Sequence, residues 1–317
     1  MALEEIFDDE TLDLVIRVCE MYYRDGMTQE AIARAVGVSR PMVSRLLSAA
    51  RAKGIVSFSI NDPRNSMRRI ADELRDRFQL RAVYVVSGAG TDDEIKKRIG
   101  VRAAQVLEQS LQPNQVLGIG RGATVFYTVS ALSGSRRVPG LRVTPLVGGA
   151  GLHDAKFQVN EMARMASEKL GGSCVFFQVP YYVTSPKIKK ALLEDAAIAQ
   201  CVSMWSNLDC ALVGIGRIAS TRDSLFLARI RAAEEYSKRR IVADICGRFL
   251  DENGEVVTEE TDVVMGIDLP ALRRSGTVLA VAGGIDKVSA IKAALKGHWV
   301  DVLVTDVSAA AGILETS

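Results

Sequence analysis

The sequence predicts an α/β protein with two parts: a small helical N-terminal domain and a larger, Rossmann-like domain with a largely parallel sheet. The first observation is length, because 317 residues exceed one ordinary domain and suffice for two. The second is a helical apolar pattern, interrupted by glycines, in the first 60 residues. The third is a change after residue 80 to short apolar runs that alternate with helical patterns.

Composition is that of a compact soluble protein, with 48% hydrophobic and 25% charged residues and 26 glycines against 8 prolines. The five cysteines are scattered and form no Cys-x-x-Cys pair, which excludes a disulfide framework or a zinc site and favours a reducing compartment. The N-terminus lacks the pattern of a signal peptide, and no run of about 20 apolar residues occurs. We therefore expect a cytoplasmic protein without membrane contact, metal or cofactor.

Three helices are expected before residue 54. Apolar side chains at spacings of three and four predict a helix over residues 11 to 24 that ends at Gly26. In the second helix Thr28 is a suitable N-cap, and Gly37 supplies the left-handed residue that ends it. Ser39 is then expected to cap a third helix that runs to about Lys53.

Two helices joined by a short glycine turn are typical of a DNA-binding helix-turn-helix, and the alternating pattern after Gly54 predicts a strand and hence a wing. Arg40 and Arg45 are the best candidates for DNA contact, because a guanidinium can bond guanine or phosphate in a fork. The complete set of predicted DNA-contacting residues is Thr28, Gln29, Ser39, Arg40, Pro41, Met42, Ser44 and Arg45. The alternative interpretation is a helical bundle with a solvated basic face.

Charge distribution supports the DNA-binding interpretation more than the overall balance of +2 does. The first ten residues carry five acidic side chains and no basic one, whereas the stretch from Arg24 to Lys53 carries six basic and two acidic side chains. A positive field therefore lies on the segment that resembles a DNA reader.

The turn-rich sequence NDPRNS places a domain boundary near residue 62, which divides the chain into a DNA-binding domain of residues 1–61 and a second domain of residues 62–317. Apolar residues at helical spacing from Met67 to Phe78 follow. They predict a helix that packs on its own domain, with a dimer seam as the alternative.

Eight apolar runs in the second domain predict buried strands: LRAVYVV, QVLGIG, LRVTPLV, CVFFQVP, ALVGIG, IVADIC, TVLAVAGG and VDVLVTD. Helical stretches lie between them, among them QVNEMARMASEKL, PKIKKALLEDAAIA, DSLFLARIRAAEEYSK and DKVSAIKAALKG. This alternation predicts a largely parallel sheet, in which ligands bind at the carboxyl ends of the strands.

Glycine loops follow four of these strands, at Gly118-Ile-Gly120-Arg-Gly122, Gly148-Gly149, Gly214-Ile-Gly216 and Gly283-Gly284. A helix that begins after Gly122 would aim free N–H groups at an anion, with Arg121 and the Thr124 hydroxyl beside it, which favours a phosphate ligand. The loops match neither a GxGxxG dinucleotide motif nor a P-loop. Each glycine could alternatively serve only a tight turn.

The order and spacing of these motifs make the chain similar to SorC/DeoR-type sugar-binding regulators over nearly its full length. The segments that carry the resemblance are MTQEAIARAVGVSRPMVSRLLSAARAKGIV, LGIGRGATV, PLVGGAG, ALVGIG, ADICGRFLDENGEVV and AVAGGIDKVSAIKAALKGHWVDVLVTDVSAAAGIL. The resemblance implies a domain similar to sugar-phosphate isomerases and deaminases, a phosphorylated sugar or polyol effector, operator DNA of a catabolic operon, and a homotetramer built as a dimer of dimers.

Site residues are also implied by the resemblance. The phosphate cradle would consist of Gly120, Arg121, Gly122, Ala123 and Thr124, and the rest of the effector site of Gly148, Gly149, Gly214, Gly216, Asp244 and Lys287. Asp244 would accept sugar hydroxyls and Lys287 would add a cation; a turn carboxylate and a solvated helix lysine are the alternatives. The family often has an aromatic residue in place of Arg121 and a polar one in place of Ala123, so an unphosphorylated sugar or polyol is an alternative effector.

The alternative function is a sugar-phosphate isomerase or deaminase fused to a DNA-binding module. Such chemistry needs a positioned acid or base. His153 beside Asp154 is the one histidine near a candidate site, and Lys156 could form a Schiff base. Side chains of sequence neighbours point in different directions, so we expect no enzyme. We expect a two-state regulator whose effector alters DNA binding.

Overall fold

The computed structural model describes residues 9–58, 63–149, 158–218, 224–257, 259 and 262–315. The chain divides into two compact units, Met1–Asp62 and Pro63–Ser317. Each unit has a hydrophobic core of its own.

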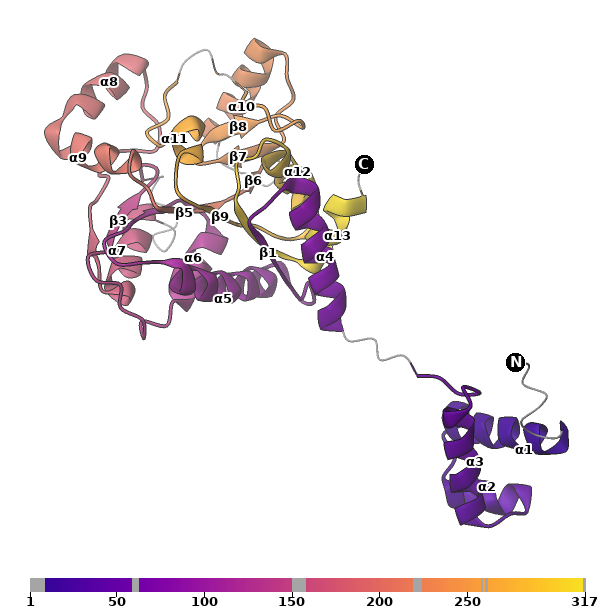
Figure 1. Ribbon diagram of the computed structural model, residues 1–317. Helices are drawn as coiled ribbons and strands as arrows, with labels where there is room; N and C mark the ends of the chain where they lie inside the picture. Colours follow the sequence, from indigo (N-terminus) through magenta and orange to yellow (C-terminus); the bar gives the residue numbers. More distant parts are fainter. Residues whose placement is uncertain are drawn as a thin grey trace. The chain divides into compact units, whose positions relative to one another are not determined.

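The N-terminal unit is a helical helix-turn-helix, as the apolar spacing predicts (Figure 1). Its elements are α1 (Asp9–Cys19), the π-helical continuation η2 (Glu20–Arg24), α2 (Gln29–Val36) and α3 (Arg40–Ala52). Both α1 and α2 pack on α3. Fully buried Val18, Ile32 and Val43 contribute one core residue from each of α1, α2 and α3.

The turns of this unit are largely those that the sequence predicts. The hydroxyl oxygen of Thr28 accepts a hydrogen bond from the N–H of Ala31 at 3.2 Å, and Gly37 ends α2 with a left-handed φ of 73°. Ser39 occupies the N-cap position of α3, but its side chain makes no capping hydrogen bond. Residues 55–58 form no strand, so the predicted wing strand is wrong there, and residues 59–62 lie outside the described residues. An extended segment needs a partner strand to form a sheet, and the alternating apolar pattern does not indicate whether such a partner is present.

The large unit is built on a parallel seven-stranded sheet with strand order β1-β10-β9-β5-β2-β3-β4. Its strands are β1 (Ala82–Val86), β2 (Val116–Ile119), β3 (Arg142–Pro145), β4 (Ser173–Cys174), β5 (Cys210–Gly214), β9 (Val278–Val281) and β10 (Val302–Asp306). From β2 the chain winds through β3 to β4, and from β5 it winds in the other direction through β9 to β10. The windings diverge between β2 and β5, which is the point where such sheets bind ligands.

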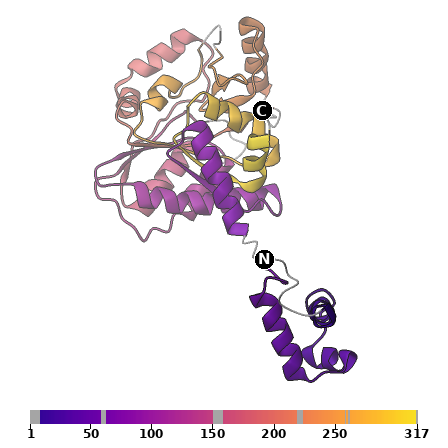
Figure 2. The same ribbon diagram turned by 45° about the vertical axis from the view of Figure 1, so that its right-hand side comes forward.

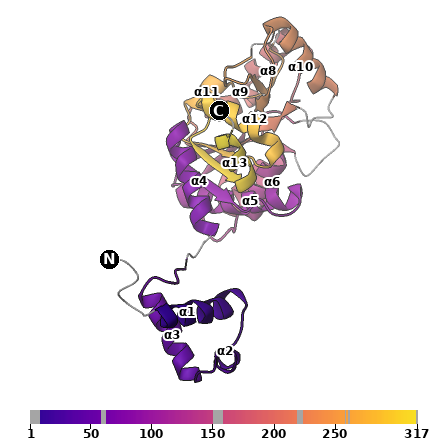
Figure 3. The same cartoon turned by 90° about the vertical axis from the view of Figure 1, so that its right-hand side faces the viewer.

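Two groups of helices pack against this sheet (Figures 1 and 3). The first group is α5 (Asp92–Ser110), α6 (Ala123–Ala131) and α7 (Val159–Leu170), and the second is α4 (Pro63–Phe78), α12 (Val288–Lys296) and α13 (Val307–Glu315). Figure 2 shows α13 beside α4, which also contacts β1. The helix predicted from residue 67 therefore packs on its own unit, and it begins earlier than expected, at Pro63.

Three predicted elements differ from the structure. CVFFQVP forms only the end of β4, and IVADIC belongs to a small antiparallel sheet of β6 (Gly216–Arg217), β7 (Ala243–Ile245) and β8 (Arg248–Leu250). The predicted helix PKIKKALLEDAAIA is broken into α8 (Pro186–Glu194) and α9 (Ala196–Trp205). Asp195 causes the break, because it leaves the helical conformation and its carboxylate accepts from the N–H of Ala197 at 2.9 Å.

The remaining elements lie between β6 and β7, between β8 and β9, and directly after β9. They are α10 (Ser224–Ser237), α11 (Leu269–Arg273) and the 3₁₀ turn η5 (Ile285–Lys287). Helix α10 packs its buried Phe226 and Ile230 with Phe249 of β8 in a separate small cluster. Within the part of the chain that the structure describes, no helix has the length and apolar character needed to cross a membrane.

Asp306 at the end of β10 links helix α13 to the glycine loop after β9. Its fully buried carboxylate accepts hydrogen bonds from the N–H of Gly284 at 2.5 Å and from those of Ser308 and Ala309 at 2.9 and 3.3 Å. It therefore caps α13 and fixes the glycine loop after β9 at the same time.

Asp306→Ala should lower the free energy of unfolding by about 3 kcal/mol, because three backbone donors lose their acceptor. Urea unfolding followed by circular dichroism measures this. Asp72→Ala is the control, since its side chain is 62% exposed on α4 and its loss should change the free energy by less than about 0.5 kcal/mol. Equal effects of the two substitutions would contradict the assigned role of Asp306.

Candidate functional site

A cavity of about 640 Å³ lies at the carboxyl ends of β2, β5 and β9 in the large unit. The loops that follow these three strands carry the glycine motifs, and the strands are neighbours in the sheet. Eight of the predicted effector-site residues line the cavity: Arg121, Gly122, Ala123, Thr124, Gly214, Gly216, Asp244 and Lys287. The topology thus brings together residues that are up to 166 positions apart in the chain.

The N-terminus of α6 forms one wall of the cavity. Gly122 precedes the helix with a φ of 134°, a conformation that only glycine adopts readily, and Ala123 and Thr124 begin the first turn. The first N–H groups of a helix have no partner within it, so they are available to an anion. Arg121 lies at the same place, with its guanidinium carbon 4.9 Å from the ring centroid of Tyr181.

Three predicted glycines do not line the cavity. The N–H of Gly120 is bonded to the carbonyl of Leu212 at 2.8 Å, so it serves the sheet. A Cβ on Gly148 would lie 2.4 Å from the carbonyl oxygen of Pro180, and the N–H of Gly149 is bonded to the carbonyl of Val179 at 2.9 Å. These two glycines allow the chain around residue 180 to pack closely, and contact with a ligand is untested for all three.

Asp244 on β7 is the buried carboxylate of the cavity. Its Oδ1 is shielded from solvent and has no hydrogen-bond partner. A Cβ on Gly216 would lie 3.1 Å from its Oδ2, so the glycine lets β6 approach it. Burial raises the pKa of Asp244 to about 6, against the opposing charges of Arg121 and Arg229. The side chain therefore carries a charge at neutral pH with one oxygen free to accept a hydrogen bond.

Lys287 in η5 is the second cation predicted for the effector site. Its ammonium donates to the carbonyl oxygen of Ile215 at 2.7 Å. Burial, together with the charge of the nearby Lys96, lowers the pKa of Lys287 to about 8. No ion pair involving Arg121 or Lys287 occurs within the described ranges, so both remain available to a ligand anion.

Several residues of the cavity wall carry no sequence motif. Lys96 of α5 forms an ion pair with Asp92 in the first turn of that helix, and Arg217 of β6 lies 3.4 Å from the carboxylate of Asp286. Phe226 of α10 adds an aromatic wall. The capping box at Thr91 marks the start of α5, but no sequence signal indicates that this end meets the glycine loops.

Of the residues considered for catalysis or as histidine candidates, only His298 is among the described residues. His153, Asp154 and Lys156 lie outside the described residues. His298 lies in the turn after α12, with a φ of 53°. Across residues 9–58 and the described parts of the large unit, no cluster of three metal-ligating side chains occurs.

The predicted DNA-contacting residues lie at the start of α2 and along α3. Thr28, Ser39, Arg40, Pro41, Ser44 and Arg45 are exposed, whereas Gln29 and Met42 are partly buried. Val43, Leu46 and Leu47 point into the core, so Ser44 and Arg45 lie on the free face of α3. No ion pair holds Arg40 or Arg45 within the described part of this unit, which leaves both for an external anion.

The charge of the buried Asp244 affects the free energy of unfolding, which can be measured. Asp244→Asn should raise the free energy of unfolding at pH 8 by about 1 to 3 kcal/mol, because wild type buries a charged oxygen without a partner. The native pKa exceeds the unfolded one, so wild type regains this stability as the pH falls through 6 towards 4. Urea unfolding at pH 8 and pH 5 should show the difference shrink. If the difference in free energy of unfolding between wild type and Asp244→Asn does not depend on pH, Asp244 is not a buried carboxylate that is charged at neutral pH.

Comparison with known protein families covers both units. A family described as "Putative sugar-binding domain" matches residues 62–315. A family described as "Bacterial regulatory proteins, crp family" matches residues 26–56, which span α2 and α3.

Individual relatives match over almost the whole chain. The chain is 29% identical over 305 residues to the "Sorbitol operon regulator" of Klebsiella pneumoniae, with 94% of this chain and 96% of that protein covered. It is 32% identical over 308 residues to the "Transcriptional regulator LsrR" of Escherichia coli (strain K12), with 95% and 94% covered.

Solved structures show the same architecture. The crystal structure of the full-length sorbitol operon regulator SorC from Klebsiella pneumoniae has a TM-score of 0.75 at 28% identity, covering 98% of this chain and all of that one. A transcriptional regulator from Streptococcus pneumoniae TIGR4 has a TM-score of 0.73 at 26% identity, covering 80% and 98%. These proteins are named as regulators, and none of those cited is named as an enzyme.

Proposed function

The chain belongs to the SorC/DeoR-type family of sugar-binding transcriptional regulators, and we propose that its effector is a phosphorylated sugar or polyol bound in the cavity of the large unit. On this proposal the effector controls binding of the helix-turn-helix to operator DNA of a carbohydrate or polyol catabolic operon. The names of the relatives support regulation and sugar binding. The phosphate and the kind of operon rest on the site and on the family resemblance.

The observation that carries the proposal is a cavity with an anion-binding end and a hydroxyl-binding group. The N-terminus of α6 with Arg121 offers N–H donors and a cation, which suits a phosphate. Asp244 offers a free carboxylate oxygen, which suits a sugar hydroxyl. Since an unphosphorylated sugar would leave the α6 end unmatched, we favour the phosphorylated form.

We further propose that the protein acts as a homotetramer, a dimer of dimers, in the cytoplasm. Helix-turn-helix proteins bind paired half-sites, which requires at least two copies of α3. Light scattering coupled to size-exclusion chromatography, with and without the effector, tests the tetramer.

The direct test is an electrophoretic shift with DNA from the region upstream of the protein's own gene, in the presence of sugar phosphates and their unphosphorylated counterparts. We expect at least one phosphorylated compound to change the apparent affinity for DNA by 10-fold or more. If only unphosphorylated compounds act, the phosphate is wrong. If no compound acts, control by an effector is wrong.

Arg121→Gln should weaken binding of the active sugar phosphate by about 10- to 100-fold, because a charge-assisted hydrogen bond contributes about 1.5 to 3 kcal/mol. Isothermal titration calorimetry measures the dissociation constant. Arg142→Gln serves as the control, since Arg142 is exposed at the start of β3 and does not line the cavity. Unchanged affinity in Arg121→Gln would remove this residue from the site.

Arg40→Ala should weaken operator binding by about 10-fold or more, because a base or phosphate contact contributes about 1 to 3 kcal/mol. The shift assay is run at two salt concentrations against specific and unrelated DNA. Loss for the operator alone indicates base contact, and uniform loss indicates phosphate contact. Arg51→Ala at the other end of α3 is the control. No change in affinity or specificity would exclude Arg40 from the DNA interface.

A further inference from the structure

A groove of about 690 Å³ lies on the N-terminal unit, where three of its elements meet. Tyr22 of η2, the residues Thr28, Gln29 and Glu30 at the start of α2, and Arg40 at the start of α3 line it. The sequence predicts DNA contact for Thr28, Gln29 and Arg40 but assigns no role to Tyr22. The groove therefore joins a tyrosine of η2 to the predicted DNA-contacting residues.

Tyr22 reaches this groove because α1 does not continue as an α-helix. Val15 and Val18 of α1 are fully buried. In a continuous α-helix Tyr22, four residues after Val18, would extend their buried stripe. η2 is instead π-helical, with the N–H of Asp25 bonded to the carbonyl of Glu20 at 3.1 Å. A π-turn holds one residue more than an α-turn, so its side chains leave the α-helical register. No residue of η2 is buried, and Tyr22 faces the groove while part of its ring packs on the core.

The neighbouring Tyr23 has a different environment. The two tyrosine rings meet edge to face, with centroids 4.9 Å apart, and the ring of Tyr23 also packs on that of Phe58 at 5.1 Å. The hydroxyl of Tyr23 is shielded from solvent, and Tyr23 does not line the groove. The hydroxyl of Tyr22 is not shielded, and it has no hydrogen-bond partner within residues 9–58. Packing thus holds the ring of Tyr22 and leaves its hydroxyl to an external group.

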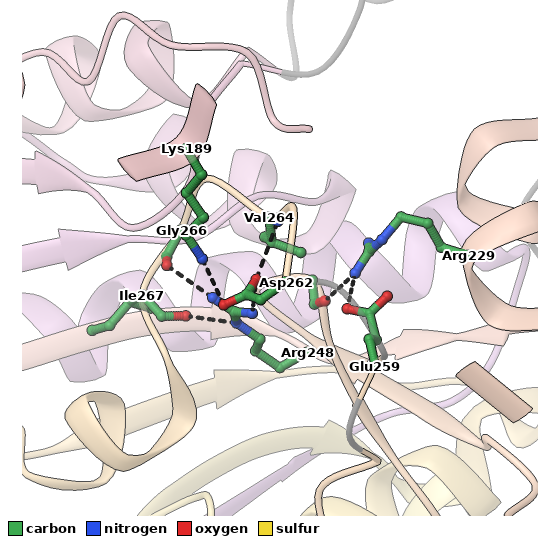
Figure 4. Close-up of polar contacts among 9 residues, drawn as sticks. Lys189, Arg229, Arg248, Glu259, Asp262, Val264, Gly266 and Ile267 are labelled. Atoms are coloured by element: carbon green, nitrogen blue, oxygen red, sulfur yellow. Dashed lines mark hydrogen bonds and ion pairs between the residues drawn. The ribbon is translucent and has the colours of Figure 1, made fainter. Parts of the chain in front are cut away.

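Arg40 is the cation of the groove. It is exposed, and its guanidinium has no ion-pair or hydrogen-bond partner in the part of the chain that the structure describes. Arg248 of β8 shows the paired alternative (Figure 4). Its guanidinium donates to the carbonyls of Ile267 and Gly266 and to the carboxylate of Asp262. Arg40 carries no such structural bonds, so its donors are available to an anion.

We propose that Tyr22 and Arg40 together hold one phosphate of the DNA backbone in this groove. A phosphate oxygen accepts hydrogen bonds from both a hydroxyl and a guanidinium. Phosphates lie on the outside of the duplex and can enter a recess, whereas base edges lie within the DNA grooves and are reached by a protruding helix. Glu30 also lines the groove, but its side chain is exposed and can turn away from a phosphate.

The inference rests on the proposed DNA binding and divides the labour within it. Arg40 contributes affinity for any DNA, with Tyr22 as a further contact that no sequence motif indicates. Ser44 and Arg45, on the free face of α3, are then the residues placed to read base edges.

The test measures binding of the full chain to DNA from upstream of its own gene and to an unrelated duplex of equal length, over a range of salt concentrations. Tyr22→Phe should weaken binding to both duplexes by the same factor, about 10-fold or more, because it removes a hydrogen bond to a charged group. The slope of log affinity against log salt should stay that of wild type, since no charge is lost.

Two further variants complete the comparison. Arg40→Ala should also weaken binding to both duplexes equally, and it should reduce the salt slope by about 1 for each bound copy of the unit. Tyr23→Phe is the matched control, because it removes a hydroxyl next in sequence that does not line the groove. It should change neither the affinity nor the salt slope.

Single neutral methylphosphonates in the upstream duplex locate the contact. At one position in each half-site the substitution should weaken binding of wild type by about 10-fold but that of Tyr22→Phe by about threefold or less, because the partner of the phosphate is already gone. Urea unfolding of Tyr22→Phe should match wild type, since the hydroxyl has no partner within the unit.

The contrary outcomes separate the two levels of the proposal. If wild type binds neither duplex, the proposed DNA binding fails, and the phosphate contact fails with it. If Tyr22→Phe binds like wild type, or loses affinity for the upstream DNA alone, the phosphate contact is wrong while DNA binding stands. If Tyr23→Phe weakens binding as much as Tyr22→Phe, or no methylphosphonate distinguishes wild type from Tyr22→Phe, Tyr22 acts only through the fold and the proposal is overturned.

Discussion

The cavity is organised around one buried carboxylate, that of Asp244. Burial raises its pKa from 3.8 to about 6, so keeping it charged at neutral pH costs about 3 kcal/mol. The charges of Arg121, Arg229 and Lys287 keep the pKa from rising further, and each of these residues comes from a different element: the loop before α6, helix α10 and turn η5. The charge of one side chain thus depends on three elements that are far apart in the sequence and that lie near it in the fold.

Sheet topology explains how these elements meet. β6 follows β5 directly, so the small antiparallel sheet begins at the carboxyl end of a central strand. β7 pairs with β6, with Gly216 opposite Asp244, and this register carries the carboxylate to the point where the windings of the main sheet diverge. Asp306, at the end of β10, fixes the third glycine loop beside the other two. A cavity at this edge follows from the strand order.

Local patterns predicted the parts of the fold that local interactions determine. Thr28 and Gly37 lie at the ends of α2, where a local side-chain cap and a left-handed backbone conformation suffice. The buried runs form strands because both faces of a parallel sheet are covered. The same patterns were wrong where long-range pairing decides. IVADIC is as apolar as a central strand but pairs with β6 and β8, and Asp195 divides one helical stretch in two. No pattern could show that residues 55–58 lack a partner strand.

The residues of the candidate site also fall into those that the sequence predicts and those that it does not. Arg121, Gly122 and Thr124 were predicted because the helix-end motif is contiguous in sequence. Asp244 and Lys287 were predicted from the resemblance to the family. Lys96, Arg217 and Phe226 also line the cavity but carry no motif, since only the fold brings them to it.

The unpaired oxygen of Asp244 also bears on how such a protein can switch. A ligand shifts an equilibrium only by its difference in affinity for the two states. A cavity wall that contains a charged carboxylate oxygen without a partner is destabilised when the cavity is empty, and a ligand that pairs this oxygen removes that destabilisation. In a second state that does not bury Asp244 in this way, the ligand gains nothing, so the whole of this gain becomes differential affinity. The cost of the empty site is then the source of the regulatory free energy, which explains why an apolar wall would not serve in its place.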